Sequence, residues 1–441
     1  MSSDQKIHAD PTKDFFVAMI TRDISLSDCI FDLLDNSIDG ARRNLSQKAK
    51  QSDSLDGYWA KLIFDKDKFC LTDNCGGITL DDAINYAFHF GRKKDSPVDV
   101  AHGIGLYGIG MKRAIFKIGQ NATIESETVN DSFLVKVDVE AWEKSDRWEF
   151  DYEDRARSGS FGTSILINKL NPNISNQFYD STFKTTLIMA IARDYSFIIS
   201  AGFRIYIDEI QVPQYNYELR ENEELVPLSK SYEDGGVDIR IVAGIIDDIP
   251  DDIPIDLKPD KVDRYGWFIV CNNRIVLPAD KTTRTIWGDD NYNVWHNQYN
   301  GFAGFVFFSC DDPKLLPWTT TKRDVDTGDP LYRRTVGEMK AVTDEYIAYT
   351  NRRKADLEKA KNAEKSNQMV NVKVLTTNRG LTLPSVGFAE DNPKVESATI
   401  SYSKPKEEVD EVKKSLGNWS MSNRDVGRAT FDYYRKMELG K

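Results

Sequence analysis

The sequence predicts an α+β fold, with helices packed on one face of a mostly antiparallel sheet. Residues 121–128, 133–139 and 161–168 alternate apolar and polar side chains, as half-buried antiparallel strands do. Helical patterns occur early in the chain and around 176–197, so helices flank the strand-rich part of the sequence. This order of helices and antiparallel strands is typical of a two-layer α/β sandwich.

Length and composition indicate a folded chain of two or three domains, with 441 residues of which 40% are hydrophobic. The 58 Lys and Arg against 70 Asp and Glu give a net charge of −12, which disfavours unaided binding to nucleic acid or an anionic membrane. No apolar run approaches the roughly 20 residues that span a bilayer. The five cysteines form no CxxC pair and the first residues lack an apolar secretory core, so we expect a reduced, cytoplasmic setting.

The segment from Ser25 to Arg43 is predicted to form an amphipathic helix, capped by Ser25 or Ser27. Its apolar side carries Ile30, Leu33, Leu34, Ile38 and Ala41, and its polar side carries Asp32, Asn36, Asp39 and Arg43. A carboxylate one turn before an Asn amide lets one face hold a water and Mg²⁺ together, because the carboxylate takes a proton while the amide oxygen is a hard-cation ligand. An ordinary solvated helix face is the alternative.

A predicted hairpin, with strands at Tyr58–Phe64 and Phe69–Leu71, leads into the glycine-containing segment Asp73-Asn-Cys-Gly-Gly-Ile78. Glycines there let the backbone approach a flat ligand, and Asp73 can accept a hydrogen bond from an exocyclic amine. A plain glycine turn is the alternative. Thr79 is expected to cap the next helix. The apolar face of that helix is predicted to contain Leu80, Ala83, Ile84, Ala87 and Phe88.

A second glycine-rich segment precedes a helix start that carries Lys112. Its four glycines within eight residues are Gly103, Gly105, Gly108 and Gly110. They predict a mobile loop whose amides and helix dipole can cradle phosphates. The spacing matches neither the Walker pattern nor a dinucleotide fingerprint, which needs a strand directly before it.

Taken in order, these segments resemble the motifs of the GHKL ATPases, the superfamily of DNA gyrase, heat-shock chaperones, histidine kinases and MutL. The N box resembles Asp32 to Asn36, the adenine box Asp73 to Gly77, the lid box Gly105 to Lys112 and the final box Gly162-Thr163. Short independent motifs are specific together although each alone is weak. The resemblance covers roughly residues 15–345 and implies a Bergerat-type ATP-binding sandwich domain over residues 1–200.

The resemblance also implies roles for the matched residues. Asp32 would be the base that activates water, and Asn36 would hold Mg²⁺. Asp73 would bond the adenine amino group, and Thr163 would help there through a water. The other residues expected to contact the nucleotide are Asp39, Gly77, Ile78, Gly105, Tyr107, Gly108, Ile109, Gly110, Met111 and Lys112.

Two positions depart from the family pattern. Hydrolytic members usually have Glu where this chain has Asp32, and the shorter side chain shifts the base from its water, so we expect slow turnover or none. Cys75 stands where the adenine box usually has its first glycine, with Gly76 displaced by one position, and we interpret this cysteine as a small packing residue.

Residues 201–345 resemble the S5-like transducer domain of GHKL ATPases, closest to the MORC and MutL branches, and include the loop Thr-Thr-Thr-Lys322-Arg-Asp. In that family a lysine reaches from this loop to the γ-phosphate, which makes Lys322 a second expected catalytic residue; a solvated loop lysine is the alternative. Residues 346–441 are expected to complete a long helix, Leu331–Ala363, and to add a linker and a helical appendage. Helices are predicted there at Glu407–Leu416 and Ser422–Met437, the second burying Val426, Thr430, Phe431 and Tyr434.

The predicted function is a cytoplasmic ATPase whose state is set by ATP and Mg²⁺. Nucleotide binding would close the Gly105–Lys112 lid and join two protomers through the first domain, and slow hydrolysis would reset them. The output would be DNA handling, which the net charge does not support, or control of a protein effector, such as an antiviral defence complex in bacteria. The alternatives are a nucleotide-sensing scaffold without significant turnover, which Asp32 favours, and an Hsp90-like chaperone.

Overall fold

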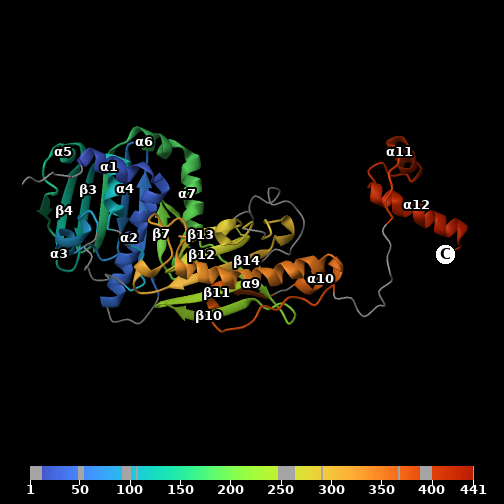
Figure 1. The fold of residues 1–441 in the computed structure, drawn as a ribbon. Coiled ribbons are helices and arrows are strands. Elements are labelled where there is room, and N and C mark those ends of the chain that lie inside the picture. The colour runs from blue at the N-terminus through green and yellow to red at the C-terminus, as the bar shows by residue number, and fades with distance from the viewer. Residues whose placement is uncertain are drawn as a thin grey trace, which may run out of the picture. The chain divides into compact units, whose positions relative to one another are not determined.

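The computed structural model describes residues 12–47, 54–91, 101–105, 108–246, 264–289, 292–365, 368–387 and 400–440. Residues 1–388 belong to one compact unit and residues 389–441 to a second (Figure 1). The larger unit contains all the segments that the sequence predicts to form the nucleotide site.

An eight-stranded sheet forms the first part of the larger unit, with the order β5-β4-β3-β6-β2-β1-β7-β8. Its strands are β1 (Trp59–Phe64), β2 (Lys68–Asp73), β3 (Gly119–Glu127), β4 (Ser132–Asp138), β5 (Tyr152–Asp154), β6 (Gly162–Leu170), β7 (Arg204–Ile207) and β8 (Ile210–Gln211). Neighbouring strands are antiparallel except β1 and β7, which are parallel. The predicted α+β fold is confirmed, and its first sheet includes residues 204–211 of the segment expected to begin the second domain.

Seven α-helices accompany this sheet in the described residues, apart from the short α3. They are α1 (Lys13–Arg22), α2 (Leu26–Gln47), α4 (Gly110–Ile118), α5 (Val139–Lys144), α6 (Pro172–Tyr179), α7 (Ser181–Asp194) and α8 (Ser196–Ile199). Helix α4 contacts β3 and β6 and packs against α1 and α2 (Figure 1). The single helix predicted around 176–197 is wrong: the Asp180 carboxylate accepts a hydrogen bond from the Thr182 amide, so the chain starts a new helix there.

The helix after Thr79 is also shorter than predicted. The Thr79 hydroxyl accepts from the Asp82 amide, which confirms the cap, but α3 ends after Leu80–Asp82. The chain continues as one π-helical turn, Ala83–Ala87. This wider turn changes the register, so Ile84 is exposed where the sequence predicted an apolar contact.

A five-stranded sheet forms the second part of the larger unit, with the order β10-β11-β14-β12-β13. Its strands are β10 (Leu228–Asp234), β11 (Val237–Ile245), β12 (Gly266–Cys271), β13 (Arg274–Asp280) and β14 (Phe302–Ser309). Strands β9 (Glu218–Glu221) and β15 (Gln368–Asn371) pair separately, and short 3₁₀ turns occur at η4 (Thr283–Thr285), η5 (Asn297–Tyr299), η6 (Pro313–Leu315) and η7 (Val372–Val374). Two helices, α9 (Pro330–Arg353) and α10 (Leu357–Glu364), replace the predicted Leu331–Ala363 helix, because Asp356 caps a new helix at the Lys359 amide.

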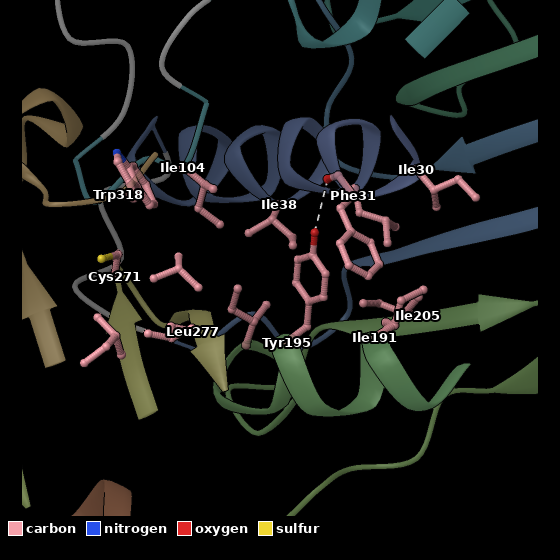
Figure 2. Close-up of a cluster of buried hydrophobic side chains, with 14 of the residues drawn as sticks. Ile30, Phe31, Ile38, Ile104, Ile191, Tyr195, Ile205, Cys271, Leu277 and Trp318 are labelled. Atoms are coloured by element: carbon pink, nitrogen blue, oxygen red, sulfur yellow. Dashed lines mark hydrogen bonds between the residues drawn. The ribbon is translucent and has the colours of Figure 1, made fainter. Parts of the chain in front are cut away.

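One hydrophobic cluster joins the two sheets. Figure 2 shows its members Ile30, Phe31, Ile38, Ile104, Ile191, Tyr195, Ile205, Cys271, Leu277 and Trp318. Trp318 is buried in this cluster only four residues before Lys322. The core therefore anchors the loop that carries Lys322 against the N-box helix.

The smaller unit contains α11 (Lys406–Ser415) and α12 (Asn423–Glu438). Ser422 caps α12 by accepting from the Asp425 amide, as its sequence predicts. Val426 is buried, but Phe431 and Tyr434 are 50% and 59% exposed, so their predicted burial is wrong. A pair of short helices offers one narrow contact seam, which cannot cover the whole apolar face of α12. Among the helices that the structure describes, none combines the length and apolar character needed to cross a membrane.

Candidate functional site

One cavity in the larger unit brings together nearly all the residues that the sequence predicts for the site. The predicted residues that line it are Asp32, Asn36, Asp39, Asp73, Gly77, Ile78, Gly105, Gly108, Ile109, Gly110, Met111, Lys112, Thr163 and Lys322. Tyr107 lies outside the described residues. Pro313 and Thr320 also line the cavity, so its wall includes the chain that follows the second sheet.

Helix α2 supplies one wall of the cavity. It begins with a capping box in which the Ser25 hydroxyl accepts from the Asp28 amide and the Asp28 carboxylate accepts from the Ser25 amide. The polar strip of α2 faces the cavity, so the alternative of an ordinary solvated face is wrong. Asn36 is exposed there between buried neighbours, and none of the described residues hydrogen-bonds its carboxamide.

Asp73 stands at the end of β2 and is held by three donors. Its Oδ2 accepts from the Ser37 hydroxyl at 2.7 Å, and its Oδ1 accepts from the Cys75 and Thr163 amides at 2.9 and 3.1 Å. Burial raises the pKa of Asp73, while these three hydrogen bonds act in the opposite direction. A Cβ at Gly162 would lie 1.9 Å from the Asp73 carbonyl oxygen, so only glycine lets β6 pass this close to the site.

Cys75 packs against α2. An ideal Cβ at Gly40 would lie 3.2 Å from the Cys75 Cβ, so the glycine leaves room for the cysteine side chain. The thiol is buried, and burial raises its pKa well above the ordinary value. Since the thiolate is the reactive form, this environment supports the interpretation of Cys75 as a packing residue.

The lid segment is attached to α2 and to the second sheet. The Asp39 carboxylate accepts from the amides of Ile104 at 2.9 Å and Gly105 at 2.6 Å. The Asn272 side chain, in the turn between β12 and β13, donates to the Gly103 carbonyl at 2.9 Å. Asp39 thus holds the lid backbone, and the second sheet contacts the same segment.

Lys112 stands in the first turn of α4, beside the glycines. Its ammonium group donates to the Ala87 carbonyl at 2.7 Å and also to the Gly108 carbonyl. Both partners are neutral backbone groups that line the cavity with it. These two bonds hold the lysine side chain at the lid.

The opposite end of the cavity is built from buried charges. The Asp32 Oδ2 accepts a hydrogen bond from Arg113 Nε at 2.6 Å and forms an ion pair with Arg113 Nη2 at 2.5 Å. The Lys322 Nζ lies 3.5 Å from Asp32 Oδ1 and 2.9 Å from Asp35 Oδ2. Burial raises the pKa of Asp32, although Lys322 and Arg113 each lower it. Lys322 is buried in the site, so its interpretation as a solvated loop lysine is wrong.

Sequence reasoning missed two residues here, Arg113 and Asp35. Asp35 lies on the apolar side of α2 and is 1% exposed. Its Oδ1 accepts from the Tyr195 hydroxyl at 2.8 Å and from Arg274 Nε at 3.2 Å, while Oδ2 accepts from Lys322. Figure 2 shows the same Tyr195 hydroxyl beside the Phe31 carbonyl of α2. A carboxylate among the apolar positions of an amphipathic helix was the available signal, because such a charge needs a buried partner.

Residues 24–166 match a family model described as histidine kinase-, DNA gyrase B-, and HSP90-like ATPase. This match supports a GHKL-type ATPase domain. It covers the N-box helix, the adenine box, the lid and most of β6. No curated protein matches the chain. ATP binding at the level of the GHKL superfamily therefore rests on the family model, and the roles of single residues rest on the geometry described above.

The residues of the GHKL-type domain fit a nucleotide. The buried Asp73 carboxylate can accept from an adenine amino group, because carboxylate oxygens have several lone-pair sites. At the other end, the exposed Asn36 amide oxygen is a suitable ligand for Mg²⁺. An ideal Cβ at Gly105 would lie 3.0 Å from Asp39 Oδ2 and 3.6 Å from Asn36 Oδ1, so the lid backbone passes close to both side chains.

Proposed function

We propose that this protein uses Mg-ATP as a switch, with ATP binding closing the lid and fixing the second sheet on the GHKL-type domain. The observation that carries the proposal is the position of Lys322. This residue follows the second sheet in the chain, yet its ammonium group lies in the cavity beside two N-box carboxylates. A ligand bound at this end of the cavity would contact both parts of the molecule at once.

In the proposed complex Asp73 binds the adenine amino group and Thr163 assists there through a water. Asn36 holds Mg²⁺ together with phosphate oxygens and waters. Mg²⁺ commonly takes only one or two protein ligands beside phosphates, so one amide oxygen is a sufficient protein contribution. The amides from Gly105 to Gly110 and the start of α4 would then surround the phosphates.

Lys322 would distinguish ATP from ADP. A cation at the γ-phosphate interacts more strongly with ATP than with ADP, because only ATP has the terminal charge. A ligand shifts a conformational equilibrium only by its difference in affinity for the two states. The γ-phosphate contact supplies that difference, and closure would let two protomers associate through the GHKL-type domain.

Asp32 would act as the base that activates water and so ends the ATP-bound state. Its carboxylate lies on α2 one turn before Asn36, beside the place proposed for Mg²⁺. An Asp in place of the usual Glu, held between two cations, favours slow hydrolysis. The switched partner would be a protein effector or a DNA-handling complex of the kind that MORC- and MutL-like proteins serve.

A second candidate function is a nucleotide sensor that binds ATP without significant turnover. It is favoured by the contacts of Asp32, since Arg113 occupies one carboxylate oxygen and Lys322 lies near the other. Phosphate release measured in a single turnover separates the two functions. A sensor would bind ATP and associate while releasing no phosphate.

The proposal is tested by sedimentation of wild type and Lys322→Ala with ADP and with a non-hydrolysable ATP analogue. We expect the analogue to drive association of wild type, and Lys322→Ala to lose most of this response while still binding ADP. Lys314→Ala removes an exposed lysine from the same region and serves as the matched control. Equal analogue-dependent association of the wild type and Lys322→Ala would refute the coupling role.

A further inference from the structure

We infer that Arg113 is a positioning residue for hydrolysis, which holds the Asp32 carboxylate so that Oδ1 is the oxygen presented to the attacking water. The inference rests on the proposed ATPase function and adds a residue that no motif assigns. Arg113 directly follows Lys112 in the first turn of α4, so it belongs to the helix that ends the lid.

The geometry of the pair is the first argument. The guanidinium Nε donates to Asp32 Oδ2 at 2.6 Å, and Nη2 forms an ion pair with the same oxygen at 2.5 Å. The side chains of Arg113 and Asp32 are 8% and 4% exposed, so little water competes for these bonds. Charge-assisted bonds from a planar guanidinium restrict the orientation of a carboxylate more than one flexible ammonium contact does.

The second argument is the close approach of α4 to this carboxylate. An ideal Cβ at Gly110 would lie 3.1 Å from Asp32 Cβ and Cγ and 3.2 Å from Oδ2. The absence of a side chain at Gly110 therefore lets the first turn of α4 lie directly on Asp32. From that turn Arg113 reaches back to Oδ2, on the side away from Lys322.

The third argument is the competing cation. Lys322 Nζ is 3.5 Å from Oδ1, beyond a short ion pair, and lies closer to Asp35 at 2.9 Å. Without Arg113, rotation about χ2 of Asp32 would let its carboxylate turn fully toward Lys322. The hydrogen bond and ion pair of Arg113 on Oδ2 oppose that rotation, and they leave Oδ1 on the side of Lys322, which we propose to be the side of the γ-phosphate.

A consequence is that the base depends on the lid. Arg113 and Lys112 are neighbours in α4, and Lys112 bonds the Gly108 carbonyl within the lid. A shift of the first turn of α4 therefore moves the group that orients Asp32. Hydrolysis would be fastest when the lid helix stands where Arg113 reaches Oδ2.

The experiment compares wild type, Arg113→Gln, Arg113→Lys, Asp32→Asn and the double variant Asp32→Asn/Arg113→Gln. Phosphate release gives kcat and KM, and calorimetry with a non-hydrolysable ATP analogue gives binding. We expect Arg113→Gln to lower kcat by about 10–100-fold, since a displacement on the order of 1 Å at a reacting group has that effect. The KM and the affinity for the analogue should change by less than about threefold, because Arg113 acts through Asp32 rather than on the nucleotide.

The double variant distinguishes a role that acts through Asp32 from a general structural role. If Arg113 works through the Asp32 carboxylate, adding Arg113→Gln to Asp32→Asn should lower the residual rate by less than about twofold. Arg113→Lys keeps the charge but not the planar guanidinium, so its kcat should lie between those of Arg113→Gln and the wild type. If Arg113→Gln does not fold, as thermal melting would reveal, Arg113→Lys still tests the inference by its lowered kcat at unchanged affinity.

Three results would overturn the inference while the proposed function stands. A rise in kcat of Arg113→Gln would mean that Arg113 blocks Asp32 rather than orienting it. Weaker binding of the ATP analogue with unchanged ADP binding would make Arg113 a phosphate ligand, and an equal loss in both backgrounds would make it a structural residue. A wild-type protein that binds ATP and releases no phosphate would overturn the hydrolytic function itself, and the positioning role with it.

Discussion

The two ends of the cavity are built in different ways. At the end proposed for adenine, called the adenine end, Asp73 is held by a hydroxyl and two backbone amides, and its most distant partner is 90 residues away in the same sheet. At the end proposed for the phosphates, called the phosphate end, Asp32 and Asp35 contact cations from three other segments, the most distant being Lys322, 290 residues beyond Asp32. The adenine end thus belongs to the GHKL-type domain alone, whereas the phosphate end requires the second sheet.

This difference indicates at which end of the cavity a bound nucleotide would affect the contact between the two sheets. The partners of Asp73 all belong to α2, the first sheet and the turn after β2, so the proposed adenine contact would not involve the second sheet. The phosphate end is a cluster of buried charges, and buried charges are costly unless each keeps its partner. A terminal phosphate added to this cluster would alter the ion pairs that connect the two sheets. The adenine end makes no such connection through the hydrogen bonds of Asp73.

The largest expected effect is on chemistry at the phosphate end. Asp32→Asn should lower hydrolysis by about 10²–10⁴-fold while ATP affinity stays the same, because it removes a positioned base and leaves the adenine contacts intact. Asp32→Glu should preserve or raise the rate. Phosphate release and calorimetry test both variants, and normal hydrolysis by Asp32→Asn would place the base elsewhere.

The next effect is on stability. Asp35→Asn leaves Lys322 and Arg274 buried without their shared carboxylate, and breaking a buried pair in this way costs about 3–5 kcal/mol in the free energy of unfolding. Asp28→Asn is the matched control on the same helix, because Asp28 pairs with the more exposed Arg323 at 3.2 Å and should cost about 1 kcal/mol or less. Urea unfolding measures both, and equal losses would contradict the special role of the Asp35 cluster.

A smaller effect is expected at the adenine end. Asp73→Asn should keep the fold but replace part of an acceptor by a donor, which weakens ATP binding by about 1.5–3 kcal/mol as a charge-assisted hydrogen bond is lost. ADP should lose the same amount, since both nucleotides carry adenine. Unchanged ATP affinity in calorimetry would contradict the assignment of Asp73 to adenine. A loss of affinity for ATP but not for ADP would contradict the proposal that this end binds only the adenine.

The smallest effect is expected for Thr163→Val. The amide of Thr163, not its hydroxyl, bonds Asp73, and this bond survives the substitution. Only the proposed water-mediated contact to adenine is lost, so the change in ATP affinity should be about 1 kcal/mol or less. A loss as large as that of Asp73→Asn would show that the adenine end depends on side chains more than its geometry indicates.

The local features of this protein could be predicted from its sequence. The caps at Ser25, Thr79 and Ser422 and the β1–β2 hairpin were predictable, because a cap or a turn depends on residues only a few positions apart. The order of the N box, adenine box, lid and final box was readable for the same reason. Periodicity did not predict the new helix starts at Asp180 and Asp356, where the Asp carboxylate caps the following helix.

The pairing of the buried carboxylates with their cations could be known only from the tertiary structure. In the sequence, Asp32 stands on the polar side of a predicted helix and Asp35 among its apolar positions, but the pattern names no partner for either. Because α4 packs on α2, Asp32 forms an ion pair with Arg113. Because the second sheet and the loop after it pack beside α2, Asp35 forms ion pairs with Lys322 and Arg274. An ion pair between distant segments depends on where the whole core places them, and no local pattern carries that information.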